Sequence, residues 1–502
     1  MKKLLLFAFL FVTLMSLRAQ QSPAGLPEFA IDRSQVESQL RYLASDELKG
    51  RRTGSEGNNI AAKYIADRLQ ELGYTSPEGA DQYFQKIPFV AKRPPKTGSL
   101  KLGDLTFTQG KDLIMLDGVE KTLETIAVFA GYGWVDETSG RDDYKGLNVE
   151  GKVVIVLSGK PESSDPSDVF NAMGTKRKLA AERGAAALVE VYTLSYPWQF
   201  FSRYFGRERI EPGEVNQDEM LYAWIQGADK KAIADLRAGH PVQAEFTSGA
   251  SNNQNMASQN VIGVLEGSDP ELKEEYMLLT AHYDHVGTGK QGGGAYGPRD
   301  SIFNGARDNA MGVVALLTAA EALAKDPPKR SVIILAVTAE EIGLLGSQYY
   351  ADHPLIPLEK TIFNINTDGA GFNITDGVAL IGWNRTGTDK WVEMGLNPFG
   401  LEVIPEPARE QNLFDRSDNV SFARKGVPCL TFSPGFREFD RELMQYYHQV
   451  TDEADSMDFD YVLKFCRAFA YTSRLIADSD IRPMWVKGDK YEAAGKMLYQ
   501  QK

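Results

Sequence analysis

The sequence predicts an α/β protein with a mixed, mainly parallel central sheet flanked by helices, into which a β-rich domain is inserted. After Asn260 short apolar runs alternate with a helical segment. The elements are a run ending Met277–Thr280, a helix over Asn309–Ala324, and runs over Val332–Val337 and Ile362–Ile365. Runs of this kind, separated by helices, are typical of buried parallel strands.

The second observation is a change of character between residues 113 and 254. Short strands such as Thr125–Phe129 and Val153–Leu157 are punctuated there by glycines, which favours a β-rich segment. One helix near Lys176–Arg183 precedes an apolar strand over Ala185–Val191. Because this block separates early helices from the later alternation, we interpret it as an inserted domain.

Helices are expected on both sides of this insertion. Ser34 and Glu37 have the spacing of a capping box before an apolar helical face. A second helix is expected from about Ser55, with Gly73 as its stop. A last amphipathic helix is expected over Asp458–Asp478, covering the sheet.

The N-terminus has the pattern of a secretory signal peptide. Lys2 and Lys3 precede an apolar run over Leu4–Leu14, which is shorter than the about 20 residues that a membrane helix needs. We expect a mature chain from about Gln20, exported to the periplasm or secreted, with no stable membrane insertion after signal removal. The expected domains are residues 1–19 (leader), 20–112 and 255–480 (main domain), 113–254 (insertion) and 481–502 (tail).

Composition excludes some functions. A net charge of -13 repels polyanions, so a nucleic-acid partner is not expected. Cys429 and Cys466 are the only cysteines, too few for a disulfide framework and without the spacing of a thiolate zinc site. They are buried thiols or form one bridge. The sequence does not indicate an oligomeric state.

Metal-binding side chains follow the predicted strands. In open α/β sheets ligands bind beyond the carboxyl ends of the strands. His282 follows the first run, Glu340 and Glu341 follow the second, and Asp368 follows the third. Asp308 is expected to begin the helix over Asn309–Ala324, because a carboxylate is favourable at a helix N-terminus. His448, one of five histidines, lies in a polar loop before the last helix.

Taken together, these residues resemble the co-catalytic zinc peptidase family of bacterial and vacuolar aminopeptidases, which also includes glutamate carboxypeptidase, transferrin receptor and glutaminyl cyclase. The order His, Asp, Glu-Glu, Asp, His is similar to the family's pattern. Tyr42–Leu48 and Gly50–Gly54 resemble the family's N-terminal segment, and the inserted block is similar to a protease-associated domain.

The resemblance implies two Zn²⁺ per chain and peptide substrates. His282 and Asp368 would bind one zinc, Glu341 and His448 the other, and Asp308 would bridge them. Three carboxylates and a bridging hydroxide would offset the four positive charges. Nitrogen and oxygen ligands suit zinc, and manganese or cobalt also fit.

The resemblance also implies three catalytic roles. Glu340 matches the general base that takes a proton from the attacking water. Asp284 matches a carboxylate that accepts the second imidazole N–H of His282 and fixes its tautomer. Tyr447 matches a donor to the oxyanion in some members, and a packing role is the alternative.

Several residues depart from the pattern or imitate another one. Arg307, Met311 and Asn419 stand where other residues are common in the family, which bears on substrate preference.

Gly287–Gly292 has dinucleotide-fingerprint spacing but no following helix, so we expect a loop at the mouth of the site. His285 is expected to support the site or the fold, not to bind metal.

The sequence therefore predicts a zinc exopeptidase, with an aminopeptidase as the leading form. A carboxypeptidase remains an alternative because Arg299, Arg409 and Arg416 are available to bind a terminal carboxylate. A glutaminyl cyclase-type aminoacyltransferase is a further alternative, usually with one zinc. An inactive binding protein is disfavoured by the complete ligand set.

Overall fold

The computed structural model describes residues 23–137, 139–163, 166–195, 197–215, 219–227 and 230–500. It divides into two compact units, residues 1–86 with 258–502 and residues 87–257. The expected leader over residues 1–19 and the expected start near Gln20 lie outside the described residues. No helix within the described ranges has the length and apolar character needed to span a membrane.

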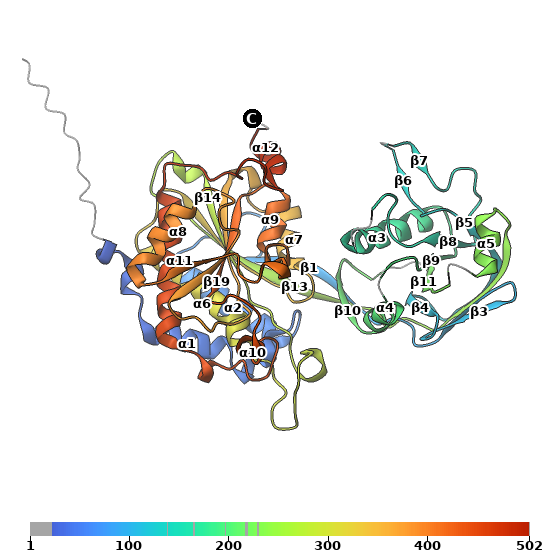
Figure 1. The fold of residues 1–502 in the computed structure, drawn as a ribbon, viewed down its shortest axis with the longest axis horizontal. Helices are drawn as coiled ribbons and strands as arrows, with labels where there is room; N and C mark the ends of the chain where they lie inside the picture. Colours follow the sequence, from blue (N-terminus) through green and yellow to red (C-terminus); the bar gives the residue numbers. More distant parts are fainter. Residues whose placement is uncertain are drawn as a thin grey trace, which may run out of the picture. The chain divides into compact units, whose positions relative to one another are not determined.

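The first unit is built on a mixed, mainly parallel sheet (Figure 1), which confirms the predicted fold class. Strands β15, β14, β16 and β19 are mutually parallel in that order, whereas β13 joins β15 and β17 joins β19 in antiparallel fashion. β18 pairs with β17 in parallel. In spatial order the strands are β13 (Gln254–Leu265), β15 (Ser331–Val337), β14 (Tyr276–His282), β16 (Thr361–Thr367), β19 (Cys429–Pro434), β17 (Gly377–Ile381) and β18 (Glu402–Pro405).

Helices cover both faces of this sheet (Figure 1). Alternate residues of β15 enter opposite cores, Ile334 in one and Ile333 in the other, because successive strand side chains point to opposite faces. One face carries α1 (Arg33–Leu43), α2 (Glu56–Glu71), α6 (Met311–Lys325), α8 (Asp389–Leu396) and α11 (Phe459–Asp478). The other carries α7 (Leu345–Asp352), α9 (Asn419–Arg424) and α12 (Glu492–Gln500).

Two expected helix starts were wrong. The side chain that caps α1 is Asp32, whose carboxylate accepts from the backbone N–H of Ser34 at 2.9 Å; Ser34 itself lies in the first turn. Helix α6 begins at Met311, and Asp308 has non-helical backbone angles in the turn Ala306–Ala310 before it. Asp308 is thus a turn residue and not the first residue of the helix.

The second unit is a mixed sheet with its own cores on either side. Its strand order is β3 (Leu105–Thr108), β2 (Gly98–Leu102), β12 (Val242–Ser248), β5 (Lys121–Phe129), β8 (Val153–Leu157), β9 (Ala187–Val191), β11 (Leu221–Ile225) and β4 (Leu113–Asp117). The helices are α3 (Pro166–Glu182), α4 (Trp198–Phe205) and α5 (Lys231–Arg237). The shorter strands are β6 (Val135–Asp136), β7 (Arg141–Asp142) and β10 (Arg209–Pro212), the last paired with β1 (Phe84–Lys92). Its likeness to a protease-associated domain stays a prediction.

The observed boundaries differ from the expected ones. The second unit is formed by residues 87–257, not 113–254, because β2 and β3 pair with β12 inside its sheet. The expected tail, residues 481–502, belongs to the first unit, where Trp485 and Tyr491 are buried beside Phe414. Cys429 and Cys466 are buried and free. The structure thus has two buried thiols and not the alternative disulfide bridge between them.

Candidate metal centre

The site lies at the carboxyl ends of three neighbouring parallel strands. His282 is the last residue of β14, and its register partner is Val337, the last residue of β15. Asp368 directly follows β16. Glu340 follows β15 after Ala339, a buried residue with φ of 61°. This left-handed residue turns the chain at the strand end, and such backbone strain concentrates at functional sites.

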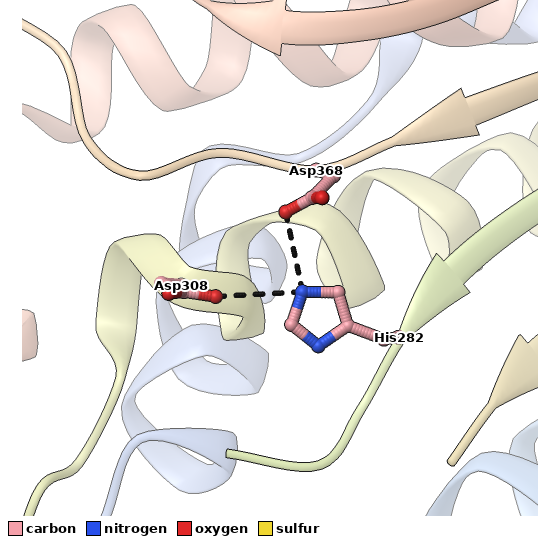
Figure 2. Close-up of side chains that lie close together, drawn as sticks. All are labelled: His282, Asp308 and Asp368. Carbon is pink, nitrogen blue, oxygen red and sulfur yellow. Dashed lines mark hydrogen bonds and ion pairs between the residues drawn. The ribbon is translucent and has the colours of Figure 1, made fainter. Parts of the chain in front are cut away.

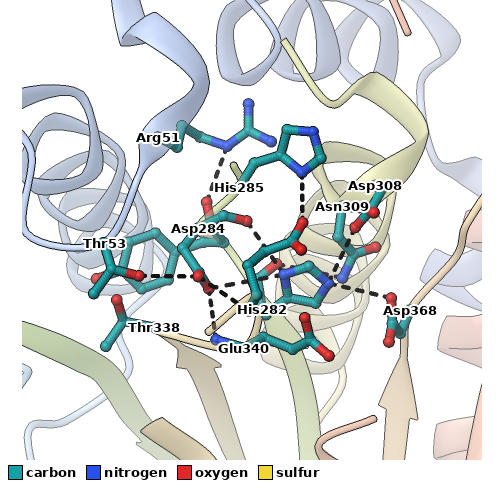
Figure 3. A network of polar contacts seen from close by, with 12 residues as sticks. Arg51, Thr53, His282, Asp284, His285, Asp308, Asn309, Thr338, Glu340 and Asp368 are labelled. Carbon is teal, nitrogen blue, oxygen red and sulfur yellow. Dashed lines mark hydrogen bonds and ion pairs between the residues drawn. The ribbon is translucent and has the colours of Figure 1, made fainter. Parts of the chain in front are cut away.

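The turn that carries Asp308 is held against these strand ends. Asn309 Nδ2 donates to the backbone oxygens of His282 at 3.3 Å and Thr367 at 3.0 Å. The buried Arg51 guanidinium donates to Tyr283 O at 2.9 Å (Figure 3) and to Gly305 O at 3.0 Å. The Asp308 turn is therefore fixed to the ends of both β14 and β16.

All five side chains expected as metal ligands come together. His282 Nε2 lies 3.4 Å from Asp308 Oδ1 and 3.2 Å from Asp368 Oδ1 (Figure 2). His448 Nε2 lies 3.1 Å from Asp308 Oδ2 and 3.1 Å from Glu341 Oε2. Asp308 thus contacts both imidazoles, one through each carboxylate oxygen, which is the position of a bridging ligand.

His285 is closer to this cluster than the sequence indicated. Its Nδ1 lies 2.7 Å from Glu341 Oε1, and its ring is buried. Ligand-type atoms of His285, Asp308 and Glu341 all lie within 4.8 Å of one another. Only its spacing of three residues from His282 pointed to the site. Since the two oxygens of Glu341 contact His285 and His448 respectively, His285 fixes how Glu341 is presented.

Asp284 holds the backbone of the two glutamates. Its carboxylate accepts from the backbone N–H groups of Glu340 at 3.1 Å and Glu341 at 3.4 Å, and from the Thr53 hydroxyl at 3.0 Å (Figure 3). His282 Nδ1 lies 3.2 Å from the backbone oxygen of Asp284 and 3.8 Å from Oδ1. The shorter imidazole contact is thus to the backbone, and the carboxylate mainly orients the Glu340–Glu341 turn.

Buried negative charge dominates the electrostatics. Burial, together with the charges of Asp368 and Glu341, raises the pKa of Glu340 well above its usual range. Burial raises the pKa of Asp284 to about 6 and that of Asp418 to about 7. Although burial lowers the pKa of His448, hydrogen bonds to Asp308 and Glu341 raise it to about 10. The carboxylates therefore favour added positive charge at this position.

The donor set fits divalent metal ions. Imidazole nitrogen and carboxylate oxygen are ligands of zinc, and buried carboxylates in excess over cationic side chains require compensation. His282, Asp308 and Asp368 form one group whose ligand atoms lie within 4.8 Å, and Glu341 with His448 extends it on the other side of Asp308. The residues present therefore fit zinc.

A cavity opens beside these groups. Asp308, Glu340, Glu341, Asp368 and His448 line it on one side. The remaining lining combines apolar and polar side chains, namely Ala370, Ile381, Leu413, Phe436, Phe439 and Tyr447 together with Arg416, Ser417, Thr431 and Ser433. The ring of Tyr447 stacks on that of His448 at 4.1 Å. The cavity therefore places a hydrophobic recess next to the acidic cluster.

The residues that depart from the family pattern point elsewhere. Met311 is buried in the core of the first unit. Asn419 is buried, donating to Phe414 O at 3.0 Å and accepting from the Thr431 hydroxyl at 3.0 Å. Neither Met311 nor Asn419 lines the cavity in the described part of the chain.

The glycine stretch beside the site is a loop, as expected. Gly287–Gly292 contains a single short turn over Gly289–Gln291, which leaves no helix N-terminus for a pyrophosphate. A Cβ on Gly294 would lie 2.1 Å from His448 O. This glycine is required because the loop passes directly over the backbone of His448.

The fold and the donor set together define the class, an α/β protein with a candidate metal site at the carboxyl ends of its central strands. Residues 260–473 match the profile of Peptidase family M28. The matched stretch runs from β13 to α11 and contains all five expected ligands.

Named relatives agree with this placement. The chain is 31% identical over 172 residues to the vacuolar membrane protease of Saccharomyces cerevisiae, covering 34% of this chain but only 16% of that protein. It is 26% identical over 445 residues to a probable leucine aminopeptidase 2 of Aspergillus oryzae, covering 84% of this chain and 77% of the relative. An aminopeptidase from Aneurinibacillus sp. strain AM-1 shares the fold, with a TM-score of 0.51 and 18% identity over 91% of this chain and 96% of that one.

Proposed function

We propose that this protein is an exported exopeptidase with two zinc ions, most simply an aminopeptidase. The observation that carries the proposal is the convergence of His282, Asp308, Glu341, Asp368 and His448, linked by contacts of 3.1 to 3.4 Å, at the rim of one cavity. His282 and Asp368 hold one ion, Glu341 and His448 the other, and Asp308 both.

The chain's own groups have distinct parts in peptide hydrolysis. Bound zinc supplies Lewis acidity and lowers the pKa of water. Glu340, which lines the cavity without being assigned as a ligand, accepts a proton from the attacking water and returns it to the leaving amino group. Asp284 keeps the Glu340 backbone in place through its 3.1 Å contact. The Tyr447 hydroxyl, whose pKa is raised by burial, stays protonated and can donate to the developing oxyanion.

The preference for an aminopeptidase has two supports. The relatives that cover most of this chain are named aminopeptidases, and an acidic cluster beside an apolar recess suits a protonated amino terminus with an apolar side chain. One observation favours a second candidate, a carboxypeptidase: Arg416 lines the cavity, whereas Arg299 and Arg409 are not among the described lining residues.

A peptide panel separates these activities. Tripeptides with free termini, acetylated amino termini or amidated carboxyl termini would be incubated with the zinc-loaded protein. We expect cleavage of free and amidated peptides and none of acetylated ones. Cleavage of acetylated but not amidated peptides would assign a carboxypeptidase, and cyclisation of amino-terminal glutamine without hydrolysis would assign the cyclase-type reaction.

Export is part of the proposal and rests on the leader pattern of residues 1–19. Mass spectrometry of the protein recovered from a secreting host is expected to find an amino terminus near Gln20. An intact Met1 in the cell interior would contradict it.

A further inference from the structure

Arg307 forms a buried ion pair beneath the metal centre. Its Nη1 donates to Asp452 Oδ1 at 3.0 Å, and the side chains are 3% and 1% exposed. Neither residue is among those that line the cavity in the described part of the chain. Arg307 therefore lies behind the lining of the cavity, and a bearing on substrate preference stays a prediction.

The pair holds the turn that carries Asp308. The Asp452 carboxylate accepts from the backbone N–H groups of Arg307 at 3.0 Å and Asp308 at 3.3 Å. The backbone oxygen of Asp452 accepts from Ala306 N at 3.2 Å. Asp452 thus caps this turn through both its side chain and its backbone, and it lies on the segment that also carries His448.

The guanidinium of Arg307 joins two further loops. Its central carbon lies 3.7 Å from the ring centre of Tyr446, which precedes Tyr447 and His448, and 5.3 Å from that of Phe372, which follows Asp368. It also donates to the backbone oxygen and the hydroxyl of Ser456 at 2.8 Å. A planar guanidinium can stack on rings and donate in its plane at once, which lysine cannot.

We propose that Arg307 and Asp452 are a positioning pair that sets the spacing of Asp308, Asp368 and His448. The inference rests on the proposed function, since these three are its metal ligands. Charge-assisted hydrogen bonds in a buried setting are strong and directional, and groups that orient metal ligands are worth roughly 10- to 100-fold in metal affinity. One side chain contacts the three ligand-bearing segments and limits their separation.

The test compares Arg307→Met with Arg474→Met in the full chain. Arg474 is a matched control because it too is a buried arginine of the first unit, paired with Glu28 and Asp326, but it contacts none of the ligand-bearing segments in the contacts described. Zn²⁺ affinity would be measured by competition with a chromophoric chelator, and hydrogen exchange would be followed at 306–309, 368–372 and 446–452. Arg307→Lys keeps the charge without the stacking plane.

Arg307→Met is expected to weaken Zn²⁺ binding by about 10- to 100-fold and to speed exchange in all three segments, with a smaller loss in Arg307→Lys. Arg474→Met is expected to lower stability while leaving Zn²⁺ affinity unchanged. Wild-type affinity and exchange in Arg307→Met would overturn the proposal. If Arg307→Met does not fold, Asp452→Asn carries the same expectations.

A wild-type chain that binds no Zn²⁺ would reject the proposed function. Hydrogen exchange in the metal-free protein would then test whether the Arg307–Asp452 pair positions the three segments. Faster exchange of the three segments in Arg307→Met than in Arg474→Met would support it, and equal exchange would reject it.

Discussion

Each of the two units contains a buried ionisable cluster, and the two clusters differ in charge balance. In the second unit Lys176 Nζ lies 2.7 Å from Glu190 Oε2, both side chains being 0% exposed, and Tyr222 donates to the other oxygen of Glu190. Lys176 also donates to Leu157 O at 2.7 Å. One positive and one negative charge cancel there, so the cluster needs no further ion.

The cluster of the first unit has an excess of carboxylates. Asp308, Glu340, Glu341 and Asp368 line one cavity, and Asp284 is buried beneath them. The charges of nearby carboxylates and hydrogen bonds donated to carboxylates raise the pKa of His282, and hydrogen bonds to Asp308 and Glu341 raise that of His448. A buried cluster that is balanced by its own side chains maintains a fold, whereas an unbalanced cluster that opens to a cavity is suited to bind cations.

The largest effect is expected at Glu340, whose carboxylate is free for proton transfer. Glu340→Gln should lower turnover by about 10²- to 10⁴-fold, because the amide cannot accept the proton of the attacking water. Turnover would be measured at saturating peptide, with zinc content determined on the same samples as the control. Near-normal turnover with both metals retained would reject the general base role.

In the balanced cluster, Lys176→Met should destabilise the second unit by about 3–5 kcal/mol, because it leaves the Glu190 charge buried without its partner. Hydrogen exchange of the amides of β8, β9 and β11 measures this locally. Lys178→Met on the same helix is the control, since Lys178 is 76% exposed and should change stability by less than about 0.5 kcal/mol. Equal protection in both variants would show that the buried pair contributes nothing.

How Glu341 is held can be tested at His285. His285→Phe removes the donor to Glu341 Oε1 and should weaken binding of one zinc by about 10- to 100-fold. His285→Asn places an amide donor near the position of Nδ1 and should therefore lose less zinc affinity than His285→Phe. Equal losses in the two variants would indicate that the ring packing, not the hydrogen bond, is what matters.

An effect of similar size is expected for Tyr222→Phe in the second unit. Burial and the Glu190 charge raise the pKa of Tyr222, so its hydroxyl is protonated and donates. Removing it should destabilise the unit by about 1.5–3 kcal/mol, the range for a hydrogen bond to a charged group. The same hydrogen-exchange measurement applies, and peptide turnover per folded chain should not change.

The two clusters also differ in how far the sequence predicted them. His282, Glu340, Glu341 and Asp368 follow strands, and strand periodicity together with the parallel sheet rule places such residues at one edge. Asp308 was placed with them, but its turn was mistaken for a helix start because the turn leads directly into the apolar helix from Met311.

Roles that depend on tertiary contact were not assigned: His285 was expected to support the site or the fold, but its partner Glu341 was not identified, and the roles of Arg51 and of the Arg307–Asp452 pair were missed. His285, Arg51 and the Arg307–Asp452 pair act through groups distant in sequence, and no local spacing indicates that Asp452 caps the turn before Asp308. The pairing of Lys176 with Glu190 across a helix and a strand was missed for the same reason. The inserted unit was found by composition, but its first strands, β2 and β3, are only five and four residues long, so the predicted boundary fell too late.

Zinc stoichiometry tests the central claim most directly. Wild-type protein that is dialysed against chelator and then titrated with Zn²⁺ should bind two ions per folded chain. The Asp308→Ala variant should bind fewer, whereas Lys176→Met should still bind two ions per folded chain. A wild-type chain that binds no Zn²⁺, or an Asp308→Ala chain that binds two with unchanged affinity, would contradict the account.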